Sequence, residues 1–342
     1  MSGVKFSEAT KVERLDSHAY RIDLSESFCT GAVPNGGYTA SCMLAAASMH
    51  LSSRGQCDTL TAHFEYLNRT KIGPAVVVIE DMKLGRQLTT LHLTLWQDGL
   101  ISQAPWVDTS VSRRRVLAYT TNANLRTFTG ISLPTGYEVT PAAALPSPPD
   151  FEALKNNGAD DHWEKSKSPE SLSEHLASIY TWNLYVPRGG PLSPGVLDMW
   201  ICMANGEHIT QTALTYVVDS FPYNLHIFLA TPALLELLNA PPERAADPQV
   251  QEVRQRNQQR SVLWSPTVVL NLEAKMALPE NGVEWLAVRV TSKQIRNGTL
   301  DLEVLVRDVD GGLVALSNQV AMLVSMDRNT GGNKGDTTKA SL

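Results

Sequence analysis

The residue with the clearest potential for chemistry is Asp219, which ends a helix that the spacing predicts over residues 206–219. A carboxylate here could act as a general base and take a proton from water. Partial burial would raise its pKa and make it a better base near neutral pH. The alternative is a capping role, but a negative charge at the C-terminal end of a helix is unfavourable by a few tenths to about 1 kcal/mol. The position therefore favours a functional acid.

A second candidate is the turn Asn35-Gly36-Gly37, which precedes a helix predicted over residues 38–51. Backbone N–H groups at a helix N-terminus suit an anion, including a developing oxyanion. The alternative is a plain tight turn. We take Asn35, Gly36, Gly37 and Tyr38 as candidate substrate-binding residues. No acid lies between Tyr38 and Gly55, so an equivalent second site is not expected.

The chain repeats one order of elements about 210 residues further along. Gly85 and the turn at Asp98 stand 13 positions apart, and Gly298 and the turn at Asp310 stand 12 apart. Only the second copy carries an acid at the end of its helix. This asymmetry predicts one active site at the seam between two similar units.

The elements predicted for each unit are a buried helix and an antiparallel sheet. The 38–51 helix carries no Asp, Glu, Lys or Arg, so it must be buried on most sides. Period-2 alternation predicts strands with one face inward. The predicted strands cover 19–28, 75–82, 91–95, 100–107, 267–274, 300–307 and 313–326. A helix wrapped by such a sheet, twice over, is an α+β double hotdog.

The domain organisation follows from changes in composition. We expect an N-terminal hotdog over 1–130, a proline-rich linker over 131–170 and a C-terminal hotdog over 171–328. An inserted segment over 222–264, with a short helix over 231–238, interrupts the second unit. The tail over 329–342 is polar and is predicted to be disordered.

Composition excludes several classes of protein. The 342 residues carry a formal charge of -6 with a pI near 5.8, and no basic run predicts a nucleic-acid or membrane partner. The N-terminal residues 1–14 lack the apolar region of a signal peptide, so we expect a cytoplasmic protein. The four cysteines form no C-x-x-C pair and the eight histidines no H-E-x-x-H motif. Neither a cofactor nor a metal site is predicted.

At the following segments the chain resembles the acyl-CoA thioesterase II-like, double-hotdog family. Each segment is short, and their order over residues 20–325 carries the resemblance. The segments are Pro34-Asn35-Gly36-Gly37-Tyr38, 64–86, 96–99, 197–206, 218–222, 265–267, 284–286 and 316–319. Between Phe221 and Trp264 the chain is longer than the family usually is, so the insertion is a candidate lid.

The resemblance implies hydrolysis of acyl thioesters by an acid, a hydroxyl and a glutamine from the second hotdog. Carried over by position, these catalytic residues are Asp219, Thr267 and Gln319. The hydroxyl and the amide would hold the attacking water, because each offers a donor and an acceptor. The alternative for Thr267 is an exposed strand threonine, and for Gln319 a structural hydrogen bond.

Three hypotheses follow for the function. The leading one is an acyl-thioester hydrolase acting on a small-molecule substrate bound to CoA or to a carrier protein. The second keeps the fold and site but catalyses a cyclisation, addition or dehydration of a polyketide-like substrate in a biosynthetic pathway. The third is a non-catalytic binder of acyl ligands. The sequence leaves homo-oligomer formation open.

Overall fold

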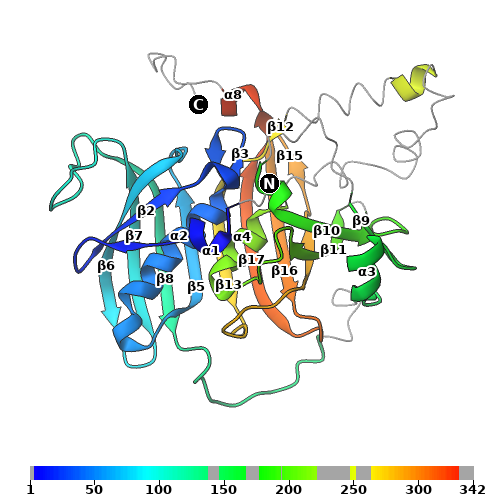
Figure 1. Ribbon diagram of the computed structural model, residues 1–342, viewed down its shortest axis with the longest axis horizontal. Coiled ribbons are helices and arrows are strands. Elements are labelled where there is room, and N and C mark those ends of the chain that lie inside the picture. The colour runs from blue at the N-terminus through cyan, green and yellow to red at the C-terminus, as the bar shows by residue number, and fades with distance from the viewer. Residues whose placement is uncertain are drawn as a thin grey trace.

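The fold is built on one antiparallel sheet that runs through both halves of the chain. The computed structural model describes residues 4–137, 146–166, 177–193, 195–221, 247–251 and 263–330. The sheet has 14 strands in the order β1-β2-β6-β7-β8-β5-β13-β17-β16-β14-β11-β10-β9, and β15 pairs with β16 at its side. Figure 1 shows the strands of the N-terminal half, mostly blue and cyan, on one side and those of the C-terminal half on the other.

In the first half, the sheet curves around the long helix α2 (Gly36–His50). Apart from its last residue, His50, this helix carries only small or uncharged side chains, and most of them are buried. The other elements of this half are α1 (Phe6–Ala9), β1 (Glu13–Arg14), β2 (Ala19–Leu24), η1 (Glu26–Phe28), β3 (Cys29–Thr30), β4 (Val33–Pro34), η2 (Ser52–Arg54), β5 (Asp58–Tyr66), β6 (Gly73–Leu84), β7 (Thr89–Gln97) and β8 (Arg113–Ala123).

The second half repeats the plan with a much shorter helix, α4 (Leu214–Asp219). Strands β13, β16 and β17 alternate buried and more exposed positions as the sequence predicts, most clearly in β17. The other elements are α3 (Phe151–Asn157), β9 (Trp163–Lys165), η5 (Ala177–Thr181), β10 (Trp182–Pro187), β11 (Val196–Met203), η6 (Gln211–Ala213), β12 (Leu263–Trp264), β13 (Thr267–Ala274), β14 (Leu286–Thr291), β15 (Ile295–Arg296), β16 (Thr299–Arg307), β17 (Leu313–Met322), β18 (Val324–Ser325) and α8 (Asp327–Thr330).

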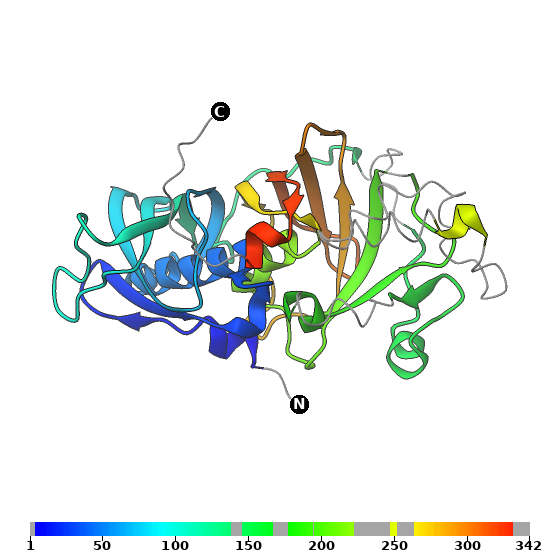
Figure 2. The same cartoon turned by 90° about the horizontal axis from the view of Figure 1, so that it is seen from above.

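The two halves join at a seam made by strands β5 and β13 and by helices α2 and α4. Leu270 of β13 pairs with Phe64 of β5, so the sheet continues across the seam. Helix α2 runs through the N-terminal half and packs against α4 near the middle of the molecule (Figures 1 and 2). A side chain at Gly37 would lie 2.3 Å from the carbonyl oxygen of Thr215, so only glycine permits this approach. The α+β double-hotdog prediction is confirmed.

Three predicted elements are wrong in their extent. The strand expected over 19–28 ends at Leu24, and residues 26–28 form the 3-10 helix η1 instead. The helix expected over 206–219 is helical only from η6 onward, because Ile209 instead forms two backbone hydrogen bonds with Val283. The strand expected over 100–107 is a loop, although Asp98 and Gly99 form the predicted turn with φ angles of 57° and 52°. The backbone of this loop bonds to itself, for example from Ile101 N–H to the carbonyl of Trp106.

The predicted linker over 131–170 also contains regular structure. Helix α3 follows the N-cap Asp150, whose side chain accepts a hydrogen bond from Ala153 N–H, and β9 adds an edge strand to the sheet. Most of the insertion over 222–264, including the helix expected over 231–238, lies outside the described residues, as do residues 331–342 of the tail. Asn329, at the start of the tail that was expected to be disordered, is instead buried and donates from its side chain to the carbonyl of Thr30 at 2.8 Å. Among the described helices, none has the length and apolar character needed to cross a membrane.

Candidate active site

The candidate site is built around the carboxylate of Asp219, the last residue of α4. Its side chain is buried, with only 2% of the residue exposed. One carboxylate oxygen, Oδ1, accepts a hydrogen bond of 2.7 Å from Thr267 Oγ1 at the start of β13. The other, Oδ2, accepts one of 2.6 Å from the backbone N–H of Gly37 in α2. The acid is therefore held jointly by the two units, at the seam that the sequence predicts.

Burial controls the acidity of this carboxyl. The loss of water around Asp219 raises its pKa from 3.8 to about 6, and the hydrogen bonds from Thr267 and Gly37 lower it in part. The N-terminal end of the α2 dipole also favours the anion. A carboxylate with a pKa near 6 is ionised at neutral pH and is a stronger base than an exposed aspartate.

Backbone and side-chain caps shape the start of α2. Asn35 is the N-cap: its Oδ1 accepts from Tyr38 N–H at 2.9 Å, and its Nδ2 donates to the carbonyl of Asp219 at 3.3 Å. A side chain on Gly36 would lie 2.9 Å from Asp219 Oδ2, so the glycine keeps the acid accessible. Among the described residues, nothing accepts a hydrogen bond from the Gly36 N–H, and Gly36 lines the adjoining cavity.

Tyr38 does not belong to this site, contrary to expectation. It is fully buried, its hydroxyl donates to the carbonyl of Ala9 at 2.8 Å, and its ring stacks on Phe28. At the start of α2, Asn35 and Gly36 line the cavity, whereas the side chain of Tyr38 points into the core. The assignment of Tyr38 as a substrate-binding residue is therefore not supported by its position.

Gln319 contacts the residue before the acid, Val218. It is buried in β17, and its Nε2 donates to the carbonyl of Val218 at 2.7 Å and to Ser317 Oγ at 3.3 Å. Its Oε1 is buried and has no hydrogen-bond partner in the described part of the chain. The structure thus brings Asp219 and Thr267 into direct contact, and it places Gln319 against the last turn of α4 without a direct bond to either.

A cavity of about 330 Å³ opens beside Asp219 and Thr267. Its walls are mainly apolar and come from both halves of the chain. The apolar lining residues are Val33, Pro34, Leu67, Ile179, Trp264, Pro266, Val268, Met322 and Val324. A cavity of this size and character suits a small ligand with an apolar portion.

The cavity also has polar and cationic lining residues that the sequence analysis did not assign to the site. Tyr66 donates from its hydroxyl to the carbonyl of Gly36 at 2.8 Å and so braces the turn. The guanidinium of Arg69 lies over the ring of Trp264, 5.1 Å from its centroid, and Arg328 lines the same cavity. No local motif marks these residues. Tyr66 falls within the 64–86 segment of the family resemblance, but nothing in that segment placed it at the site.

Comparison with known proteins agrees with this architecture. The chain matches the model of the acyl-CoA thioesterase N-terminal domain over residues 24–114 and that of the acyl-CoA thioesterase C-terminal domain over residues 148–323. It is 69% identical over 337 residues to the thioesterase-like protein TwmA of Talaromyces wortmannii, with 98% of this chain and 97% of that protein covered. The chain belongs to the acyl-CoA thioesterase II-like, double-hotdog family.

Two solved structures share the fold of this chain, and one further protein matches part of its sequence. A putative thioesterase II from Thermobifida fusca has a TM-score of 0.62 at 17% identity and covers 94% of this chain and 97% of its own. Acyl-CoA thioesterase II TesB2 from Mycobacterium marinum has a TM-score of 0.53 at 16% identity, with 94% and 98% covered. These two share the fold. The ustilagic acid biosynthesis cluster protein orf2 of Mycosarcoma maydis is 30% identical over 114 residues, which is 28% of this chain and 30% of that protein.

Proposed function

We propose that this thioesterase-like protein hydrolyses acyl thioesters with a water molecule activated by Asp219. One observation carries the proposal: a buried carboxylate, held by Thr267 and Gly37, borders an apolar cavity at the seam of the two hotdogs. Membership of the acyl-CoA thioesterase II-like family supports the same reaction class.

The reaction needs a base, an attacking water and a donor for the oxyanion. Each oxygen of the Asp219 carboxylate accepts one hydrogen bond and keeps a further lone pair for the water. The water oxygen attacks the thioester carbonyl carbon as its proton passes to Asp219. The N–H of Gly36, which lines the cavity, is our candidate donor to the oxyanion. Loss of one such donor typically costs about 10²- to 10³-fold in rate.

Collapse of the tetrahedral intermediate completes the hydrolysis. The C–S bond breaks, the carbonyl re-forms, and the thiolate receives the proton that Asp219 took from the water. The products are a carboxylic acid and a free thiol, so atoms and charge balance. Within the described residues Gln319 keeps one acceptor, Oε1, and we assign it and Thr267 to the orientation of the water or of the last turn of α4.

The cavity supports an assignment of substrate parts. Its apolar wall around Trp264 fits the acyl group. The cations Arg69 and Arg328 line the same cavity and fit a phosphate of the thiol carrier, whether CoA or the phosphopantetheine of a carrier protein. The similarity to a biosynthesis cluster protein supports a role in a biosynthetic pathway, and we retain the cytoplasm as the proposed compartment.

A panel of acyl-CoA and acyl-phosphopantetheine thioesters tests the proposal. Free acid and free thiol are measured together by chromatography and mass spectrometry, because the exposed Cys57 would react with thiol-detecting dyes. Wild type should release both products in equal amounts. Asp219→Asn should be slower by at least about 10²-fold, since general-base help is typically worth about 10²- to 10⁴-fold.

The control is Asp23→Asn, which makes the same charge change at an exposed position of β2 and should keep full activity. Equal rates for wild type and Asp219→Asn would refute the role of the acid. A modified acyl product without thiol release would favour the non-hydrolytic tailoring reaction. Tight binding of an acyl ligand without any product would favour the binder.

A further inference from the structure

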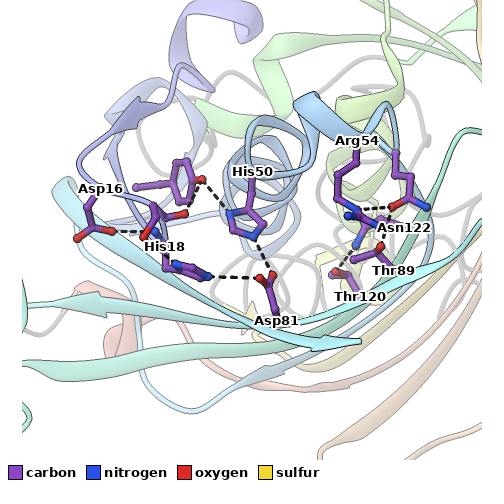
Figure 3. Close-up of polar contacts among 11 residues, drawn as sticks. Asp16, His18, His50, Arg54, Asp81, Thr89, Thr120 and Asn122 are labelled. Atoms are coloured by element: carbon purple, nitrogen blue, oxygen red, sulfur yellow. Dashed lines mark hydrogen bonds and ion pairs between the residues drawn. The ribbon is translucent and has the colours of Figure 1, made fainter. Parts of the chain in front are cut away.

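A cluster of possible metal ligands lies in the N-terminal unit, at the opposite end of α2 from the candidate active site. It consists of His18 just before β2, His50 at the end of α2, and Asp81 in β6. His50 Nε2 is 2.8 Å from Asp81 Oδ1, and His18 Nε2 is 3.3 Å from Asp81 Oδ2. All the ligand atoms lie within 4.8 Å of one another, and Figure 3 shows both imidazoles converging on the carboxylate.

The outer nitrogens of both imidazoles are held by hydroxyl groups. His50 Nδ1 is 2.9 Å from the Tyr20 hydroxyl, and His18 Nδ1 is 2.9 Å from Ser17 Oγ. The Tyr20 hydroxyl itself donates to the carbonyl of Ser17 at 3.3 Å, so its oxygen is open to an N–H from His50. Metal-bound histidines commonly donate their second ring N–H in this way, which leaves the Nε2 lone pair for the metal.

The backbone also fixes the cluster. The carbonyl of His18 accepts a hydrogen bond of 2.8 Å from Ile79 N–H in β6, and Asp16 Oδ1 accepts one of 2.8 Å from His18 N–H. A bulge in the pairing of β6 with β7 follows Asp81. The three side chains therefore come from neighbouring elements that backbone pairing already holds together.

We propose that His18, His50 and Asp81 bind a divalent transition-metal ion of the Zn²⁺ type. Two imidazole nitrogens and a carboxylate are a common protein ligand set for zinc. Ligand atoms of a tetrahedral zinc ion lie roughly 3.3 Å apart, given bonds of about 2.0–2.2 Å. Two of the present spacings, 2.8 and 3.3 Å, are near this value, and none exceeds 4.8 Å. The His18 side chain is 49% exposed, which leaves room for ion entry and for water at the fourth position.

The ion would stabilise the fold without taking part in the proposed hydrolysis. It would tie the C-terminal end of α2 to β6 and to the residue before β2. Gly37 and His50 are about 20 Å apart along the helix, by the rise of about 1.5 Å per residue. The alternative is a metal-free network in which both Nε2–H groups donate to Asp81.

Titration of EDTA-treated, dialysed protein with Zn²⁺ in a calorimeter distinguishes the two. We expect one Zn²⁺ per chain for wild type and a loss of affinity beyond about 10²-fold in His18→Gln and Asp81→Asn. Tyr20→Phe should weaken binding by about 10- to 10²-fold, the usual effect of removing a hydrogen-bond partner of a metal ligand. The matched control is His92→Gln, which breaks a two-residue pair between His92 and Glu80 on the neighbouring strands and should leave binding unchanged.

Three results would overturn the metal site. The first is no Zn²⁺ binding by wild type in the micromolar range, and the second is a Zn²⁺ affinity in His18→Gln and Asp81→Asn equal to that of wild type. The third is a thiolate charge-transfer band in the Co²⁺-substituted protein. The last would assign the ion to a cysteine. Asp219→Asn should bind Zn²⁺ normally, so the outcome is independent of the hydrolase proposal. Circular dichroism checks that each variant is folded. His18→Gln is the variant least prone to misfold, because the His18 side chain is half-exposed.

Discussion

Replacing Asp219 by asparagine should make the folded protein more stable above pH 7. Burial raises the pKa of this carboxyl from 3.8 to about 6, so ionising it is harder in the folded than in the unfolded chain. Each pKa unit is worth about 1.4 kcal/mol, which puts the loss of folding stability at about 3 kcal/mol at pH 8. Asparagine avoids this loss because it does not ionise.

The geometry permits the replacement. The amide oxygen of the introduced asparagine would accept from Gly37 N–H, and its NH₂ would donate to Thr267 Oγ1, so both hydrogen bonds of the carboxylate have counterparts. The sign follows from proton binding: the folded state of wild type holds the proton more tightly, so its stability falls as pH rises from about 4 through 6. The gain from Asp219→Asn should grow over the same range.

Urea unfolding at pH 5 and pH 8 measures the effect. We expect Asp219→Asn to gain about 3 kcal/mol over wild type at pH 8 and roughly half of that at pH 5. Asp23→Asn, at an exposed position, should show no such gain. A gain in unfolding free energy of the same size at both pH values, or no gain at pH 8, would refute the presence of a buried, ionised carboxylate at position 219.

The remaining predictions concern activity and packing. The kcat/KM for thioester hydrolysis should rise with pH through about 6 and level off above 7, because the pKa of Asp219 is raised to about 6 and the ionised form is the base; a flat profile from pH 5 to 8 would contradict this. Thr267→Val should lower kcat by about 10- to 10²-fold. It should also move the pH profile to higher pH, because the Thr267 hydroxyl lowers the pKa of Asp219. Thr267→Ser, which keeps the hydroxyl, should have a kcat and a pH profile near those of wild type. Gly37→Ala should destabilise the protein by about 1–3 kcal/mol in thermal unfolding, since the new methyl would lie 2.3 Å from a backbone carbonyl. Gly130→Ala, where nothing lies within 4 Å, is the control, and an equal effect of the two would count against the tight α2–α4 approach.

The strands and the long helix were predictable because their patterns are local. Alternation in 267–274 and 300–307 matches β13 and β16 almost residue for residue, and the uncharged run after Gly37 is the buried helix α2. Short-range patterns failed where a distant partner decided the backbone. Ile209 leaves the helical conformation because it pairs with Val283, more than 70 residues away.

The site was predictable only in part. Asp219 stood out because its charge is unfavourable at the end of a helix, and Thr267 and Gln319 followed from the family resemblance. The backbone N–H of Gly37 as a direct partner of the acid, and Tyr66 as its brace, did not follow from the sequence. Each contact joins groups that are far apart along the chain and come from different elements.

The amino-acid sequence alone determined that two hotdog units occur in the chain and that only one of them ends its helix with an acid. Only the tertiary structure decided that this acid is buried, shared between the units and beside a cavity. The same holds for the cluster of His18, His50 and Asp81, which no spacing motif marks. The physical reason is that the pKa of a group and the ligands around an ion depend on distances through space. Those distances are set by how the strands and helices pack, not by spacing along the chain.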